Sequence, residues 1–182
     1  MSAGAILATS VSLLLAACAA ETAPGPAPSA AAAAPAPATL PAASDADLLA
    51  RGDYLVRIAG CNDCHTQGYA RAGGEVPREQ WLMGSHEGFS GPWGTTYPSN
   101  LRLLVNGMAE EEWMAYTATL RTRPLMPDFA VRAMHEDDRR ALYRFIRSLG
   151  PAGAPAPAAL PPGETPQGPH LALVLPEAPA TE

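Results

Sequence analysis

The chain has 182 residues and a formal net charge of −6, but its charged and large apolar side chains are spread unevenly. Residues 44–150 hold 14 acidic residues against 12 arginines, so this region is nearly neutral, which argues against a nucleic-acid partner. Residues 18–43 and 151–182 are rich in Pro and Ala, with too few large apolar side chains to offset the entropy of ordering them. The sequence therefore predicts one folded domain at residues 44–150 between disordered segments.

The amino-terminal segment, residues 1–17, is mostly small or apolar and ends in Leu15-Ala16-Ala17, directly before Cys18. It resembles a bacterial lipoprotein signal peptide that is cleaved before Cys18, with lipid on the cysteine sulfur, although its start lacks Lys or Arg. An ordinary signal peptide and an uncleaved span are the alternatives. With the lipid, residues 18–43 become a tether and the protein is expected in the periplasm, anchored to a membrane; without it, the protein is soluble there.

The first predicted helix begins after Ser44, a favoured capping residue, with Asp45 and Asp47 in the first turn, where negative charge suits the helix dipole. An apolar stripe at helical spacing follows, formed by Leu48, Gly52, Leu55 and Ala59. Glycine costs about 1 kcal/mol relative to alanine inside a helix. Its place in the stripe predicts that another helix crosses closely at Gly52.

This helix leads into the pentapeptide Cys61-Asn-Asp-Cys64-His65. Two cysteines separated by two residues and followed by histidine are typical of covalent haem attachment, in which each thiol adds to a vinyl group and the imidazole binds the iron. A zinc half-site and a dithiol redox motif are the alternatives. Zinc needs further ligands, and no cysteine follows Cys64; a redox dithiol does not require the adjacent histidine. Haem attachment is therefore the favoured interpretation.

The middle of the domain, residues 66–107, is rich in Gly and Pro and has no sustained period, so we expect loops with short helical turns. Trp81, Trp93 and Tyr97 are either core aromatics or residues whose N–H and O–H groups donate to haem propionates. Trp93, Tyr97 and Asn100 are the candidate propionate contacts.

Two more helices are predicted before the Pro-rich end of the chain. Residues 109–121 place four side chains on one face: Trp113, Tyr116, Thr117 and Leu120. Residues 136–149 bury a second face, formed by Leu142, Phe145, Ile146 and Leu149, and Gly150-Pro151 stops the helix. Strand-like alternation is missing, so the predicted fold class is all-α.

Five segments carry a resemblance to a known family: residues 52–55, 61–66, 91–100, 123–127 and 137–149. In them the domain resembles class I c-type cytochromes, most closely monohaem cytochromes and cytochrome subunits associated with bacterial periplasmic dehydrogenases. The resemblance implies three main helices and loops around one covalent haem c, with the first and last helices crossing near Gly52. The family often has Ser or Thr at the caps of its later helices, where this chain has Ala109 and His135, so fraying is expected there.

The family takes its second axial ligand from a methionine in the loop before the last helix, and Met126, followed by Pro127, occupies that place. His65 is then the proximal ligand and Met126 the distal one, while Cys61 and Cys64 hold the haem. The competing thioethers are Met83, Met108, Met114 and Met134. A bis-histidine site with His86 or His135 is a further alternative.

The favoured function is a one-electron carrier between a dehydrogenase and the respiratory chain, with a terminal oxidase or another cytochrome as acceptor. The chain is then no enzyme itself, and no small-molecule substrate binds the iron. The alternative is a dedicated haem subunit of a periplasmic dehydrogenase that oxidises an alcohol, aldehyde or sugar. A haem protein with an open sixth site, of the ligand-binding or peroxidase type, and a purely structural lipoprotein are less favoured.

Overall fold

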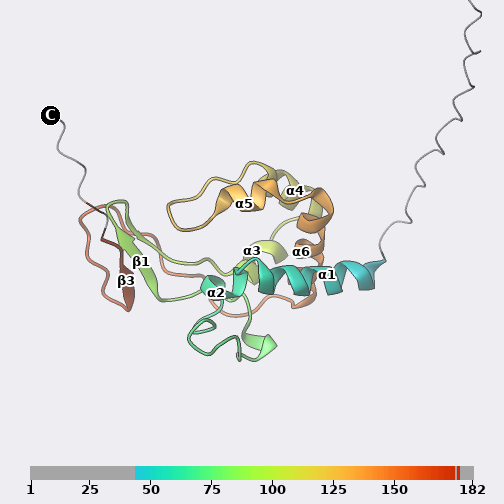
Figure 1. The fold of residues 1–182 in the computed structure, drawn as a ribbon, viewed down its shortest axis with the longest axis horizontal. Helices are drawn as coiled ribbons and strands as arrows, with labels where there is room; N and C mark the ends of the chain where they lie inside the picture. The colour runs from blue at the N-terminus through green and yellow to red at the C-terminus, as the bar shows by residue number, and fades with distance from the viewer. Residues whose placement is uncertain (1–43, 175, 177–182) are drawn as a thin grey trace, which may run out of the picture. The chain divides into compact units, whose positions relative to one another are not determined.

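The computed structural model describes residues 44–174 and residue 176; the predicted signal peptide, Cys18 and tether lie outside them. Within the described residues the chain forms one 3-10 turn (Arg78–Gln80), six α-helices and three short strands (Figure 1). The helices are α1 (Asp45–Ile58), α2 (Cys61–His65), α3 (Leu101–Asn106), α4 (Glu110–Ala118), α5 (Asp128–Ala133) and α6 (Glu136–Ser148). The strands are β1 (Gly88–Gly91), β2 (Gly94–Thr96) and β3 (His170–Ala172). No helix in this part of the chain has the length and apolar character to cross a membrane.

Helix α1 begins where the sequence predicts. The Asp47 backbone N–H donates to Ser44 Oγ at 3.2 Å, and the Ser44 N–H donates to the Asp47 carboxylate at 3.1 Å. Together these bonds form a capping box, which satisfies two backbone donors that a helix start otherwise leaves without partners. The predicted cap is confirmed.

The crossing of α1 and α6 organises the core. A Cβ atom on Gly52 would overlap the backbone carbonyl of Ala141 and the Cβ of Phe145, so only glycine allows the two helices this close. The predicted close approach at Gly52 is therefore confirmed. It explains why a residue that weakens an isolated helix stands in the buried stripe.

The buried faces agree with the sequence pattern in most positions. Leu142, Phe145 and Ile146 of α6 are buried, together with Trp113 of α4. Two predicted core positions are wrong: Ala59 is exposed just beyond the end of α1, where Val56 takes its place in the core, and Tyr116 is exposed. The second predicted helix is also shorter than expected, because α4 ends at Ala118.

The all-α prediction requires a correction, because three strands form a small sheet in the order β2-β1-β3. Strands β1 and β2 make an antiparallel hairpin, and β3 pairs parallel to β1 from the far end of the sequence (Figure 1). The strands have only three or four residues each, too few to show alternation. Helices α2, α3 and α5 also add to the three main helices that were expected.

The prediction of a disordered carboxy-terminal segment is wrong for residues 151–174, which are attached to the domain at several places. Asn100 donates to the carbonyls of Ala152 at 2.8 Å and Ala154 at 3.1 Å. Further along, Leu160 pairs with Thr95, and β3 joins the sheet. Backbone groups supply most of these bonds, so a Pro- and Ala-rich composition does not reveal them.

Candidate haem site

The haem motif folds as helix α2, which follows α1 after a sharp turn. The turn is made at Gly60, whose φ of 69° lies in the left-handed region that glycine adopts without strain. Cys61 and Cys64 are free thiols, the first half-buried and the second exposed. The site is thus carried on α1, which the α6 crossing holds in place.

The electrostatics of the two thiols argue against the dithiol redox interpretation of the motif. Burial raises the pKa of Cys61 to about 11, and burial together with the Asp63 carboxylate raises the pKa of Cys64. Dithiol redox motifs depend on a lowered thiol pKa. The surroundings of both cysteines instead favour the protonated thiol.

His65 is set up as a ligand through one specific nitrogen. Its side chain is buried, and burial lowers its pKa, which favours the neutral ring that binds metals. The Nδ1 atom lies 2.7 Å from the Ser99 carbonyl oxygen. Because a carbonyl oxygen only accepts, Nδ1 must carry the proton and donate it. Nε2 therefore keeps its lone pair for an axial bond, as second-shell contacts to metal-binding histidines commonly arrange.

A buried network fixes the other side of α2. The Leu82 N–H donates to Thr66 Oγ1 at 2.8 Å, and the Thr66 hydroxyl donates to Asn62 Oδ1 at 2.7 Å. Next to it, the Gly84 N–H donates to the His65 carbonyl at 2.7 Å. These bonds tie the motif to the 81–84 segment and restrict the movement of His65.

The segment behind His65 also lines a pocket. Ser99 belongs to its wall, and the pocket has a volume of about 360 Å³. Around Ser99 the lining is mostly apolar and comes from the β2–α3 region and the carboxy-terminal segment: Tyr97, Asn100, Leu103, Leu104, Pro155, Ala156 and Pro157. The pocket therefore adjoins the segment that orients His65 through Nδ1.

The three candidate propionate contacts differ in their surroundings. The Trp93 indole N–H is buried and has no hydrogen-bond partner among the described residues, and such donors are rare in folded proteins. Tyr97 is half-buried and lines the pocket. Asn100 caps α3 by accepting the Leu103 N–H, and both of its own donors go to the carboxy-terminal segment. Its amide therefore attaches the carboxy-terminal segment to the domain, and its propionate contact stays a prediction.

Met126 lies half-buried in the loop before α5. Hydrogen bonds between residues of the loop and the start of α5 hold it in place. Thr122 Oγ1 donates to the Met126 carbonyl at 3.3 Å, and the Asp128 N–H donates to the same oxygen at 2.8 Å. The Thr122 N–H closes the loop by donating to the Asp128 carboxylate at 2.8 Å. Leu125 adopts a left-handed φ of 88°, an uncommon conformation for leucine.

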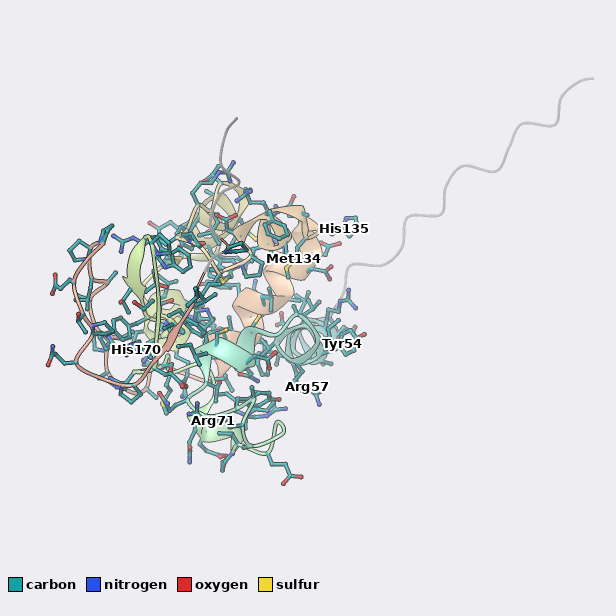
Figure 2. The ribbon with its side chains drawn as sticks, turned by 60° about the vertical axis from the view of Figure 1, so that its left-hand side comes forward. Tyr54, Arg57, Arg71, Met134, His135 and His170 are labelled. Carbon is teal, nitrogen blue, oxygen red and sulfur yellow. The ribbon has the colours of Figure 1, made fainter. Side chains whose placement is uncertain are left out.

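The competing ligands lie in different surroundings. Met108, Met114 and Met134 pack against the hydrophobic core. His86 is exposed, and His135 is exposed at the start of α6, where Figure 2 shows it at the periphery. Packing against the core explains the presence of these three methionines without a role in binding iron. Met126 remains the predicted distal ligand.

The residues present fit a c-type haem. Two free thiols flank one turn of helix, and the next residue presents an unprotonated Nε2. The unpartnered Trp93 N–H supplies a donor of the kind that a propionate takes. Cys61, Cys64 and His65 would hold the haem, with Met126 as the distal ligand.

Sequence reasoning missed several residues that position this site. Ser99 acts through its carbonyl and Thr66 through a buried hydroxyl, and nothing in their identity shows these roles. Arg102 is buried and donates to the carbonyls of Glu79, Leu149 and Gly150, which binds the end of α6 to α3. Its position as the one arginine in the apolar run 101–105 is the sequence feature that indicates a buried arginine there.

Comparison with known proteins gives one relevant relative. The chain is 29% identical over 128 residues to the fructose dehydrogenase cytochrome subunit of Gluconobacter japonicus, an alignment of 64% of this chain and 24% of that protein. The chain thus corresponds to about a quarter of the relative's length. No protein-family model and no solved structure matches it. The similarity to a dehydrogenase cytochrome subunit supports haem binding and an electron-transfer role.

Proposed function

We propose that this chain is the haem-bearing electron-transfer subunit of a dehydrogenase, with one covalent haem c. The observation that carries the proposal is the orientation of His65, whose Nδ1 donates to Ser99 and leaves Nε2 free beside two unpaired thiols. The similarity to a dehydrogenase cytochrome subunit favours this role over a free shuttle. A single Cys-x-x-Cys-His motif in the sequence supports one haem.

The protein's contribution is to hold and tune the cofactor. When bound, haem c supplies an iron centre that accepts and releases one electron at a time. Cys61 and Cys64 fix it covalently, and the Ser99 carbonyl orients the His65 ring and raises its basicity. The Met126 thioether raises the potential, which suits an acceptor of electrons from a dehydrogenase. Trp93 and Tyr97 would donate to the propionates.

The cofactor assignment can be tested on the purified protein. Haem staining of a denaturing gel should reveal a covalent haem, and Cys61→Ala with Cys64→Ala should abolish it. The ferric wild type should show the weak far-red sulfur-to-iron band, which should vanish in Met126→Leu and persist in Met134→Leu, whose side chain packs on the core. A high-spin wild type that binds carbon monoxide readily would refute His/Met ligation in favour of an open sixth site.

The partner can be tested by purification at low salt from the native host. We expect a stoichiometric dehydrogenase subunit to accompany the chain, and the haem to be reduced when that enzyme's substrate is added. Isolation of the chain alone, with electrons delivered equally well by unrelated donors, would instead support a free carrier that serves a terminal oxidase or another cytochrome.

We further propose a periplasmic location with a lipid anchor on Cys18. The residues before Cys18 support this through their resemblance to a lipoprotein signal peptide. Cys18→Ser should move the protein from the membrane fraction to the soluble periplasmic fraction and abolish labelling with a radioactive fatty acid. Unchanged fractionation and labelling would contradict the proposal.

A further inference from the structure

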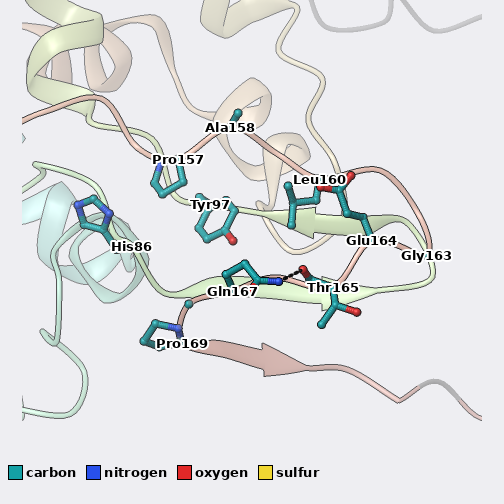
Figure 3. A pocket seen from close by; sticks show the side chains of 11 residues that line it. His86, Tyr97, Pro157, Ala158, Leu160, Gly163, Glu164, Thr165, Gln167 and Pro169 are labelled. Carbon is teal, nitrogen blue, oxygen red and sulfur yellow. Dashed lines mark hydrogen bonds between the residues drawn. The ribbon is translucent and has the colours of Figure 1, made fainter.

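The carboxy-terminal strap, residues 151–174, is attached to the domain at three places. Its start is bound by Asn100, its middle by Thr95, and its end by β1, to which Pro169 and Leu173 are hydrogen-bonded. Between these points it encloses a pocket of about 660 Å³ with Tyr97 and His86 (Figure 3). The strap therefore contacts the domain chiefly through its anchors.

The middle anchor is the most closely fitted. The Thr95 N–H donates to the Leu160 carbonyl at 3.0 Å, and the Leu160 N–H donates back at 2.9 Å. Thr95 is fully buried. A Cβ on the preceding residue, Gly94, would overlap the Leu160 carbonyl oxygen, and Gly94 has a left-handed φ of 97°. The glycine is thus required for the strap to lie here.

The same carbonyl oxygen reaches the distal loop. Arg123 Nη1 donates to Leu160 O at 3.3 Å, and Arg123 precedes Met126 by three residues. Within the described chain, the other hydrogen bonds of residues 122–128 stay inside the loop or run to α5. This bond therefore ties the Met126 loop to a segment far away in the sequence.

The two partners of Leu160 belong to the two sides of the site. Thr95 lies in β2, and the chain continues from β2 through Tyr97 to Ser99, which holds His65. Arg123 lies in the loop that carries Met126. A single strap residue thus connects the segment behind the proximal ligand with the loop of the distal ligand.

We propose that Arg123 and the Leu160 carbonyl form a positioning contact that holds the Met126 loop closed, so that the strap controls occupancy of the sixth axial position. This rests on the His/Met ligation proposed above. A hydrogen bond from a charged donor at an exposed site is modest, and its loss should open the loop about fivefold more often. Carbon monoxide reaches ferrous iron only when Met126 is displaced, so its binding reports opening.

The test uses the purified holoprotein and variants at exposed or turn positions. Arg123→Ala should speed carbon monoxide binding about fivefold, weaken the far-red band, lower the potential and increase amide exchange at residues 122–128. Arg123→Lys, which keeps a donor, should restore most of the wild-type behaviour. Arg121→Ala is the matched control, because among the described residues the side-chain hydrogen bond of Arg121 goes to the carbonyl of its neighbour Leu120 and does not reach the strap.

A second variant tests the contact between Arg123 and the Leu160 carbonyl by displacing Leu160. Gly94→Ala should displace Leu160 and reproduce the effect of Arg123→Ala, and the double variant should show no further increase, because both act through one contact. Additive effects, or equal rates in Arg123→Ala and wild type, would overturn the proposal. A wild type without a far-red band would instead refute His/Met ligation itself, so the two failures are distinguishable.

Discussion

Two leucines with the same unusual backbone conformation lie on opposite sides of the candidate site. Leu82 on the proximal side has a φ of 61° and is fully buried, whereas Leu125 in the distal loop has a φ of 88° and is 46% exposed. Leu82 is surrounded by the Thr66 network, while the loop of Leu125 is held mainly by its own bonds. The predicted ligand His65 thus lies next to a segment anchored in the core, and the predicted ligand Met126 lies in a loop held at the surface.

This difference has a functional consequence. A change at the surface, such as contact with a partner protein, can alter the Met126 loop without disturbing the core that fixes His65. The iron potential responds to its axial ligand. With the proposed His/Met ligation, partner contact would act on the haem through the Met126 loop, while the core around His65 would keep the cofactor in place.

The largest contrast should come from replacing each leucine with glycine. Leu82→Gly leaves a cavity, and large-to-small core substitutions cost about 2–5 kcal/mol. Relief of the left-handed strain, about 1 kcal/mol, is offset by a similar entropy cost of glycine, so a net loss of about 3 kcal/mol is expected. Leu125→Gly relieves similar strain at an exposed site and loses about 1 kcal/mol through chain entropy, so its free energy of unfolding should stay near wild type. Denaturant unfolding measures both.

Equal losses from the two glycine variants would contradict the comparison. They would mean that the distal loop is as tightly coupled to the core as the 81–84 segment. Far-UV circular dichroism before unfolding serves as the control that both variants retain their helices.

The next contrast compares two threonine hydroxyls. Thr66→Val removes the acceptor of the buried Leu82 N–H and the donor to Asn62, and leaving such groups without partners costs about 2 kcal/mol. Thr122→Val removes an exposed 3.3 Å bond to the Met126 carbonyl and should cost less than about 0.5 kcal/mol. Unfolding in denaturant again gives the values. A larger loss at Thr122 would reverse the assigned roles of the two sides.

The sequence predicts the features that depend on residues close together in the chain. It does not predict those that depend on contacts between distant residues. The haem motif, the Ser44 cap and the Gly52 crossing depend on residue types at short spacing, and the last two are confirmed. The sheet depends on β3 meeting β1 across some 80 residues, and the strap depends on backbone bonds of residues such as Leu160. The amino-acid composition indicates neither the pairing of β3 with β1 nor the attachment of the strap.

The same limit applies within the candidate site. His65 follows from the motif, but its orientation depends on a carbonyl 34 residues away, at Ser99. Asn100 is predicted at a propionate, and the structure gives its two donors to the strap, a segment that the composition predicts to be disordered. The contacts of this residue therefore depend on a remote segment that the composition does not reveal.

A smaller effect on stability is expected from the capping residues of α1 and α6. Helix α1, before the proximal motif, has the Ser44 cap, whereas α6, after the distal loop, begins at His135 without a side-chain cap. His135→Ser should stabilise the protein by about 1 kcal/mol, and Ser44→Ala should destabilise it by a similar amount. Thermal unfolding measures both. A neutral His135→Ser would mean that the start of α6 gains nothing from a cap.

The smallest effect concerns the pH dependence of the α1 cap. The Ser44 hydroxyl and then the Ser44 backbone N–H donate to Asp47 and hold the pKa of its carboxyl below the ordinary value of 3.8. Since the native pKa lies below the unfolded one, the charged carboxylate stabilises the fold above pH 3.8. This contribution is lost as pH falls from 3.8 through the lowered native value.

Asp47→Asn should therefore unfold with a shallower acid dependence than wild type in this window, while Asp45→Asn, in the same turn but outside the capping box, should change it less. The measurement is denaturant unfolding at a series of acid pH values. If Asp47→Asn and wild type run parallel throughout, the capping box contributes no stability to α1. The anchoring of the proximal side would then rest on the Gly52 crossing and the Thr66 network alone.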